Sequence, residues 1–599
     1  LQTPSQLHDA ILTMDKFSNS LPVAIASIGS SKITLLVGSA ITVGADATIP
    51  DNIILWFVGP GKLFVNSGKV LTINSPSQVL AHTQQQVFDG TGTVSFTNGG
   101  IVSPGWWGFS SGGTAAANAD AYNACTASLT ATGGTIVIPP TGAAHQVDDT
   151  LTHPAKPMSV IGAHPELSII ESTATASLKH GLTFTRSHHV RNLTIKTSAS
   201  LASNYDMYGV RMDLDGVTVS GGNQAVKWES VKVRGFNNSF YCDGGDAYNV
   251  DRLYFNDLDA QCSGPASTYI GSCLYINRVT QVYGTHSQFD QNSTGEHAIY
   301  CFGSKNLVFD GFKIRNFDKG TAQAIKVVGN GVAPDDDQAY PTWSIRNMDI
   351  ADGLNGILCG IYGTETLEAL TVENCKFVDV DTSAAILGCV YLSAAGTSNI
   401  RTLRVSGIST RNCLYQGVHV ATGASATTGP VSIRDCKGYN WSTTSAGTYT
   451  WFGTSGTGTF GPITLEGIEA DGNSKGRTIL SSSGQASTIS RIRYSGLKEV
   501  NTTNMGRPIS LPEADATPSL AIGNWFVQPN TGAQNITAYD NLEANQTYYI
   551  RFSTANTTLI DGANLQLAGS TNYNPPANTF MTFYCSDGTA LYEVSRSVN

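Results

Sequence analysis

The chain repeats one short pattern of apolar and polar positions along its central part. Each copy has three apolar positions: the first and second are separated by one residue of any type, and the second and third by two residues. Gly, Asn or Asp usually stands just before the third apolar position. The ten copies recur about every 22 to 36 residues and begin at Val231, Leu253, Thr280, Leu307, Trp343, Leu370, Leu403, Val431, Ile463 and Ile492. The copy at Thr280 is the weakest, because its third apolar place is filled by Thr285.

The alternation within each copy is that of a short strand with one buried face. The residue before the third apolar position is of a type that enters left-handed backbone conformation at low cost, so the chain is expected to turn there. These turn residues are Gly235, Asp257, Gly284, Gly311, Asn347, Asn374, Gly407, Asp435, Gly467 and Gly496. Because one copy cannot bury its own apolar face, the copies must stack. The pattern predicts an all-β fold built around a parallel β-helix.

The two ends of the chain have residue patterns that differ from the repeat. Residues 1 to about 100 contain hairpin-like runs bounded by Gly and Asn, and Ala115 to Thr130 is the one strong helix candidate. After about residue 510 the alternation is that of a compact antiparallel domain. We therefore predict a β-rich cap at residues 1–110, a β-helix at 111–510 and a C-terminal β domain at 511–599.

Composition and charge narrow the class of partner. The 599 residues include 62 Gly, and only 13% are charged, which suits many short strands and tight turns. A formal charge of -10 without a Lys/Arg cluster argues against nucleic-acid binding. No signal-peptide pattern and no bilayer-length apolar run occur, so membrane insertion is not expected. The chain starts at Leu1 rather than Met, and we expect an upstream segment to be missing.

The eleven cysteines show no CxxC and no Cys/His metal spacing. Cys375 and Cys436 fall on the third apolar position of the repeat, where a reduced thiol packs as a small hydrophobe. The cysteines are therefore predicted to stay reduced, as in a chain that folds in a bacterial cytoplasm.

Several segments resemble a known family. Two segments, ATIPDNIILWFVGPGKLFV and QQVFDGTGTVSF, are followed in order by GWWGF, an Ala-rich helix, GGTIVIPP and a ladder of strands. This order resembles the pectate-lyase-like β-helix of bacteriophage tailspikes and capsular polysaccharide depolymerases, notably those of Acinetobacter phages. The resemblance implies a right-handed, single-stranded parallel β-helix and a C-terminal antiparallel β-sandwich-like domain that trimerises the chain or binds glycan; a plain solenoid cap is the alternative.

The resemblance also implies a location and an activity. It implies a homotrimer in the virion, attached to the phage tail or baseplate through the missing N-terminal segment, that cleaves bacterial capsular polysaccharide at the host surface. One departure limits what can be carried over: where the family often has an acidic DGxxDDT-like segment, this chain reads SSGGTAAANADAYNA. No role of that motif is transferred.

One column of outward side chains follows the third apolar position. Equivalent positions on stacked rungs lie about 4.8 Å apart, so such a column is a physical row. Its members are predicted to be Asn237, Asp259, His286, Lys313, Asp349 and Lys376. The row is either a charge ladder in solvent or a surface that contacts glycan through Asp259 and Lys313.

A second row is predicted from the segments SFYCDG, CLYIN, AIYCFG and AIKVVG. They put Tyr241, Tyr275, Tyr300 and Lys326 on the outward face, with Phe240 and its equivalents inward. Aligned aromatic rings suit stacking on the C–H faces of sugars, and packing under a loop or against another subunit is the alternative.

Carboxylates near the tyrosines suggest hydrolysis. Glu296 is predicted as general acid with Asp243 or Asp290 as base, because two carboxylates flanking a glycosidic bond are the usual hydrolytic pair. Carboxylates two rungs apart suit an inverting enzyme, and those on adjacent rungs a retaining one.

Other activities remain open. β-Elimination on a uronic-acid glycan would use His286, Tyr300 and Lys313, while a non-catalytic adhesin or a purely structural solenoid would use none of these groups as catalysts. No cofactor and no obligatory metal are expected, because the acidic run Asp335-Asp336-Asp337 reads as a solvated turn.

Overall fold

The computed structural model consists mainly of β-strands, with two α-helices among the described residues. The structure describes residues 10–129, 132–175, 179–198, 207–214, 224–245, 248–262, 271–291, 297–317, 323–329, 339–380, 388–413, 416–441, 451–472, 480–482, 488–489, 492–495, 498–500, 509–520 and 524–597. The chain forms two compact units, one of residues 1–327 with 348–354 and one of residues 328–347 with 355–599.

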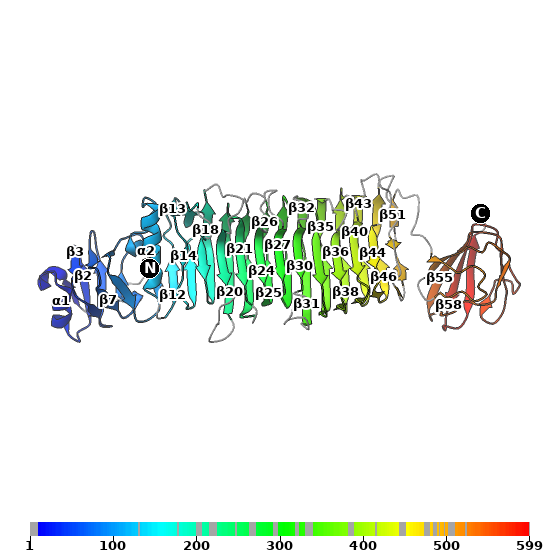
Figure 1. Ribbon diagram of the computed structural model, residues 1–599, viewed down its shortest axis with the longest axis horizontal. Coiled ribbons are helices and arrows are strands. Elements are labelled where there is room, and N and C mark those ends of the chain that lie inside the picture. The colour runs from blue at the N-terminus through cyan, green and yellow to red at the C-terminus, as the bar shows by residue number, and fades with distance from the viewer. Residues whose placement is uncertain are drawn as a thin grey trace. The chain divides into compact units, whose positions relative to one another are not determined.

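The N-terminal cap of the first unit is itself a short parallel solenoid (Figure 1). Its strands are β2 (Ile33–Val37), β3 (Ala40–Val43), β4 (Ala47–Ile49), β5 (Ile53–Phe57), β6 (Lys62–Val65), β7 (Val70–Ile73), β8 (Val79–Leu80), β9 (Phe88–Gly90) and β10 (Thr93–Phe96). Strands β2 to β7 each pair in parallel with the strand three places later, as in β2–β5 and β3–β6. The expectation of hairpins is therefore wrong: the Gly and Asn signals mark corners between strands of one turn.

One of these glycines shows why the corner needs it. A Cβ atom on Gly61 would lie 1.9 Å from the carbonyl oxygen of Val37, on the turn below. Only glycine permits that close approach of two backbones.

Helix α2 (Ala115–Ala127) confirms the helix predicted from Ala115, although it ends three residues before Thr130. Thr114 caps its first turn by accepting a hydrogen bond from the Ala117 N–H at 3.3 Å. Helix α1 (Leu21–Ile28) was not predicted, because its eight residues are rich in β-branched side chains that favour strands.

The rungs of the first unit confirm a parallel β-helix. Each full rung contributes a strand before the turn, a short strand after it and a third strand on a separate sheet. The strands before the turn are β18 (His188–Thr197), β20 (Gln224–Arg234), β22 (Val250–Asn256), β25 (Val279–Thr285) and β28 (Asn306–Asp310), of which β18 and β20 continue through the turn. Those after it are β23 (Asp259–Gln261), β26 (Gln288–Asp290), β29 (Lys313–Arg315) and β32 (Asp349–Gly353). The third series is β14 (Leu151–Thr152), β17 (Leu182–Phe184), β19 (Tyr208–Asp213), β21 (Asn238–Asp243), β24 (Ser272–Asn277), β27 (His297–Phe302) and β30 (Gln323–Val328).

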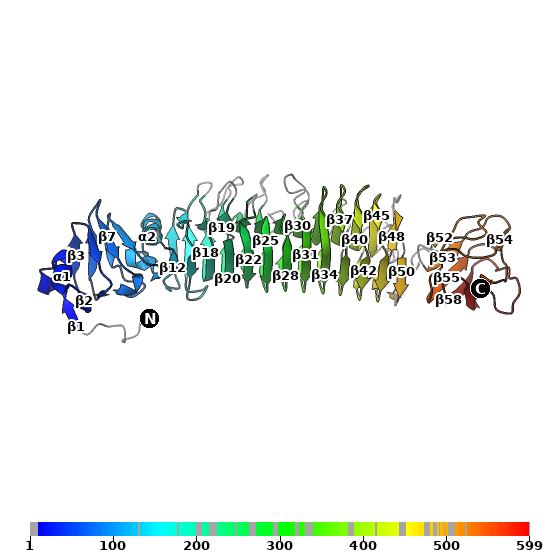
Figure 2. The same ribbon diagram turned by 90° about the horizontal axis from the view of Figure 1, so that it is seen from below.

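The turn between the first two strands uses a left-handed residue on successive rungs, as predicted. Within the first unit these residues, with their positive φ, are Asn192 (56°), Ser230 (50°), Asp257 (53°), His286 (46°) and Gly311 (76°). The strands that flank the turn lie side by side from rung to rung (Figure 2).

Two copies of the repeat lie out of the predicted register. Leu253 pairs with Val226 rather than with Val231, and it pairs on the other side with Val282 rather than with Thr280. The turn between the first two strands of these rungs is therefore made by Ser230 and His286. Gly235 has a positive φ of 85°, as predicted, but it follows the end of β20, whereas Gly284 lies within β25. The cause is chemical: Ser and His are uncommon in the left-handed region, while Gly284 takes a strand position that other rungs fill with an apolar side chain.

In the second unit the repeat runs as predicted. The first apolar residue of each copy pairs directly with that of the next copy, in the order Trp343, Leu370, Leu403, Val431, Ile463 and Ile492. They lie, in the same order, on β31 (Ala339–Arg346), β34 (Thr366–Glu373), β38 (Leu403–Ser406), β42 (Val431–Arg434), β46 (Ile463–Glu466) and β50 (Ile492–Ser495). Their turn residues Asn347, Asn374, Gly407, Asp435 and Gly467 all have positive φ. Gly496 lies outside the described residues.

The C-terminal part of the second unit forms a mixed β-sheet. Its strands are β52 (Ile509–Ser510), β53 (Trp525–Gln528), β55 (Gln546–Phe552), β58 (Thr579–Cys585), β59 (Leu591–Ser597) and β57 (Leu565–Gln566), in that order. β55, β58 and β59 pair antiparallel as predicted, whereas β52–β53, β53–β55 and β57–β59 pair in parallel. Their inward residues, such as Phe526, Ile550 and Phe583, form a core of their own. The predicted boundaries near residues 110 and 510 stay predictions.

All eleven cysteines are free and buried. This confirms that Cys375 and Cys436 pack as small hydrophobes. Among the described residues, no helix is long and apolar enough to cross a membrane.

Candidate functional site

The predicted row of tyrosines exists on the sheet of β19, β21, β24 and β27. Arg211, Tyr241, Tyr275 and Tyr300 are direct partners from strand to strand. Their neighbours along each strand, Phe240, Leu274 and Ile299, are fully buried, so alternation turns the tyrosines to the outer face. The outer rings are half-buried rather than exposed.

The rings of this row contact one another. The Tyr241 and Tyr275 rings stack with centroids 4.9 Å apart, and Tyr300 meets Tyr275 edge-on at 5.4 Å. The Lys326 ammonium lies 5.0 Å from the centroid of the Tyr300 ring, and the Arg211 guanidinium lies 5.8 Å from that of Tyr241. The row therefore combines aromatic faces with a cation at each end.

Two carboxylates stand at the carboxyl ends of the same strands. Asp213 ends β19 and Asp243 ends β21, and they are direct partners across the two strands. Asp243 is buried, and its Oδ2 accepts hydrogen bonds from the Tyr241 hydroxyl at 3.1 Å and from Asn277 Nδ2 at 2.9 Å. Its Oδ1 accepts a third from the Gly245 N–H at 2.8 Å.

The environments of the two carboxylates differ. Burial raises the pKa of Asp243 above its usual value, and the charge of Asp213 adds to the rise, although the three hydrogen bonds oppose it. Asp213 instead forms an ion pair with Arg211. Two adjacent acids in unlike environments can hold different protonation states, which is what acid–base chemistry on a glycosidic bond requires.

Arg211 is held in turn by a histidine. Its Nη1 lies 3.2 Å from Nε2 of His180. Burial, with the positive charge of Arg211, lowers the pKa of His180 to about 3, so the ring is neutral and accepts this hydrogen bond. His180 therefore positions the guanidinium without competing for Asp213.

Arg211, Asp213, Asn277 and His180 were not predicted as site residues. The segment YGVRMDLDG carries the same alternation as SFYCDG, with Met212 inward where Cys242 is inward. An alignment of those two segments would have found Arg211 and Asp213. They precede the first recognised copy of the repeat and were missed for that reason.

The predicted charged column lies on a different sheet. Lys232, Asp259, Gln288, Lys313 and Asp349 are the direct partners on β20, β23, β26, β29 and β32. Asn237 and His286 do not belong to this column, because their rungs are out of the predicted register. Asp259 and Lys313 do belong to it, as predicted.

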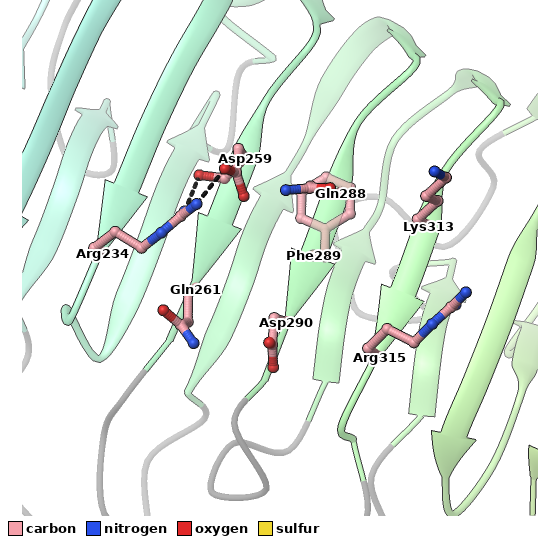
Figure 3. Close-up of a pocket in the computed structure, with 8 residues that line it drawn as sticks. All are labelled: Arg234, Asp259, Gln261, Gln288, Phe289, Asp290, Lys313 and Arg315. Atoms are coloured by element: carbon pink, nitrogen blue, oxygen red, sulfur yellow. Dashed lines mark hydrogen bonds and ion pairs between the residues drawn. The ribbon is translucent and has the colours of Figure 1, made fainter. Parts of the chain in front are cut away.

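A second row runs beside this column, two residues further along each strand. It consists of Arg234, Gln261, Asp290 and Arg315, which are also direct partners. The two rows line a hollow of about 320 Å³, shown in Figure 3. An adjoining hollow of about 420 Å³ shares Asp259, Gln288 and Lys313 and reaches the exposed His286. We call the two hollows together the charged groove.

Asp290 and Asp243 lie on different sheets, Asp290 at the end of β26 and Asp243 at the end of β21. The Asp290 carbonyl oxygen accepts a contact from the Cys273 thiol, 3.3 Å away, near the start of β24, whereas Asp243 is bonded to Asn277 at the end of β24. The two residues therefore meet opposite ends of β24. Glu296 lies outside the described residues.

The groups named for elimination are also divided. His286 and Lys313 line the charged groove, while Tyr300 projects from the tyrosine sheet. Burial raises the pKa values of Tyr241 and Tyr275 far above the usual range, so neither is a ready base. Within the described ranges, no three His, Cys, Asp or Glu residues lie close enough to hold a metal ion, and Asp335-Asp336-Asp337 lies outside them.

Comparison with known proteins gives matches at the level of solved structures. No protein-family model and no curated protein sequence matches the chain. The catalytic unit of an α-1,3-glucanase of family GH87 from Streptomyces thermodiastaticus is 12% identical, with a TM-score of 0.31 and coverage of 68% of this chain and 69% of that one.

Two further matches have similar scores. The A-module of a mannuronan C-5 epimerase from Azotobacter vinelandii is 12% identical, with a TM-score of 0.31 and coverage of 67% of this chain and 100% of the other. Tailspike protein 2 from a bacteriophage of Escherichia coli O157:H7 is 9% identical, with a TM-score of 0.30; the match covers 84% of this chain and 63% of the tailspike.

Proposed function

We propose that this protein is a bacteriophage tailspike that binds bacterial capsular polysaccharide and cleaves it internally by hydrolysis. The observation that carries the proposal is the pairing of Asp213 with Asp243 beside a row of stacked tyrosines. The sequence resemblance to tailspikes and capsule depolymerases, described above, supports a homotrimer carried on the phage tail and acting at the host surface.

The two carboxylates support a double-displacement reaction. Asp243, with its raised pKa, would protonate the glycosidic oxygen as the bond to the anomeric carbon breaks. The Asp213 carboxylate would bond to that carbon, and a water activated by the now ionised Asp243 would release the sugar in the second step. Asp213 and Asp243 stand on adjacent strands about 4.8 Å apart, which suits the short spacing of retaining enzymes.

The tyrosines support substrate binding. Stacked rings with half-buried faces offer the C–H surface of a sugar ring a rigid platform. Arg211 and Lys326 border that platform and can donate hydrogen bonds to sugar oxygens. Glu296, predicted as the general acid with Asp243 or Asp290 as base, lies outside the described residues, and the proposed pair gives the acid's role to Asp243 instead.

Mass spectrometry of the products tests the proposal. The protein is incubated with purified capsular polysaccharides, those of Acinetobacter strains first and other Gram-negative capsules after them. Fragments that carry one added water per cut support hydrolysis. Fragments of the repeat mass without that water would establish elimination, and binding without any shortening would establish an adhesin.

A further inference from the structure

The charged groove lies on a different sheet from the tyrosine row, and the proposed reaction does not use it. Its two rows span four rungs from Arg234 to Arg315, about 14 Å along the axis. A surface of this length can contact several sugar residues of a chain that runs across the rungs.

The arginines at the two ends of the groove are held in place. Arg234 forms an ion pair with Asp259 and donates to its carbonyl oxygen at 2.6 Å. Arg315 does the same on Asp349, with an ion pair of 2.8 Å and a hydrogen bond to its carbonyl oxygen of 2.7 Å. Because these contacts include the backbone, the walls of the groove are fixed before a ligand arrives, which lowers the entropic cost of binding.

The centre of the groove presents groups without partners. Within the described part of the chain, the Lys313 ammonium and the side-chain amides of Gln261 and Gln288 make no hydrogen bond or ion pair. Lys313 is also exposed. The amides can both donate and accept, and the ammonium supplies a positive charge that is not engaged in an ion pair.

This set of groups fits an acidic sugar better than a neutral one. Phe289 is buried, so its ring offers no face to a sugar and the groove must bind through hydrogen bonds and charge. A sugar carboxylate would meet Lys313 and the Gln288 amide, while sugar hydroxyls would meet Asp290 and Gln261 in the second row.

We propose that the charged groove is a second glycan-binding site, which holds a uronic-acid segment of the polysaccharide with its carboxylate on Lys313. The inference rests on the proposed function, since it assigns an acidic substrate class to the same protein. The site binds polymer but does not cleave it, and so raises the affinity for long chains through two contacts with one molecule.

Binding measurements with matched variants test the groove. The probes are purified uronic-acid-containing capsular polysaccharides and the same polymers after chemical reduction of their carboxyl groups. Affinity is measured by biolayer interferometry for the wild-type chain, for Lys313→Ala and Lys313→Glu, and for Lys32→Ala. Lys32 is exposed and lies in the N-terminal cap, just before β2, so it controls for loss of a surface charge.

The expected result is a loss of affinity of about tenfold for Lys313→Ala and more for Lys313→Glu, since a charge-assisted hydrogen bond is removed or reversed. Lys32→Ala should bind as the wild type does, and carboxyl reduction should remove the effect of Lys313. Equal affinity of Lys313→Ala and the wild type, or no binding of any acidic polymer, would overturn the inference.

Product analysis separates this outcome from a failure of the proposed function. If the wild-type chain cleaves any capsule, acidic or neutral, and Asp243→Asn does not, the proposed function is upheld. This holds whether or not the Lys313 variants lose affinity. Binding that depends on Lys313 without any cleavage upholds the groove and rejects the enzyme.

Discussion

Asp213 and Asp243 are direct partners on neighbouring strands, and only Asp243 is buried. This relationship predicts that Asp243→Asn abolishes catalysis but not folding. The amide cannot donate a proton to the leaving oxygen as an acid does, and loss of general acid catalysis typically costs about 10² to 10⁴ in rate. The rate is measured as new reducing ends released from capsular polysaccharide.

A matched substitution controls this experiment. Asp435→Asn changes another aspartate to its amide at a left-handed turn, where Asn is well tolerated. It should leave the rate unchanged. A fully active Asp243→Asn variant would remove Asp243 from the reaction.

The same pair predicts the stereochemistry of cleavage. Carboxylates on adjacent rungs are too close to admit a water between acid and base, so the anomeric configuration should be retained. Proton NMR of the first product formed, before mutarotation, distinguishes the two anomers. An inverted product would mean that the second carboxylate comes from elsewhere in the chain.

The stacking of Tyr241 on Tyr275 predicts a binding role for the rings. Tyr275→Ala should weaken glycan affinity by about three- to tenfold, because an aromatic platform contributes about 0.5 to 1.5 kcal/mol beyond its buried area. Tyr275→Phe should bind as the wild type does. Tyr283→Ala, which removes an exposed ring from a strand of another sheet, is the control, and an equal loss there would indicate a general surface effect.

Much of the fold could be predicted because apolar spacing and turn chemistry agree on most rungs. They disagree at His286, which turns the chain although His rarely has positive φ, and at Gly284, a glycine that does not turn it. In the cap, parallel and antiparallel pairings use similar apolar alternation and glycine corners, so the pairing of strands was not readable from the pattern.

Only the part of the candidate site that lies on regularly alternating strands could be predicted. The tyrosine row follows from alternation in segments of similar sequence, whereas Arg211 and Asp213 lie on a strand outside the recognised repeat. Asp290 and Asp243 lie on different sheets, and which sheet a segment joins is a property of the folded rung.

Gly284 lies within a strand rather than at a turn, and this position gives a prediction for the stability of the folded chain. A Cβ atom there would lie 2.1 Å from the Phe255 ring, inside the rung. Gly284→Ala should therefore lower the free energy of unfolding by about 1 to 3 kcal/mol through overpacking. Chemical denaturation followed by fluorescence measures this. Gly112→Ala, where a Cβ atom meets no neighbour within 4 Å, should change little.

Two buried histidines predict how stability depends on pH. His188 accepts a hydrogen bond from the Trp228 indole at 2.9 Å, and His153 lies 2.9 Å from the Tyr122 hydroxyl, with Phe184 stacked between the two imidazoles. Burial lowers the pKa of His188 to about 3 and that of His153 to about 4, whereas both would titrate near 6.5 in the unfolded chain.

Because the folded pKa values are depressed, the unfolded chain binds more protons as the pH falls. The stability contributed by these neutral imidazoles is complete above about pH 6.5 and is lost progressively toward pH 4, by about a few kcal/mol per histidine. Thermal unfolding followed by circular dichroism between pH 7.5 and 4 measures the slope. His188→Gln should have a shallower slope than the wild type, and His164→Gln, at an exposed histidine, should keep the wild-type slope. A His188→Gln variant with the wild-type slope would show that this imidazole does not stay neutral in the folded chain.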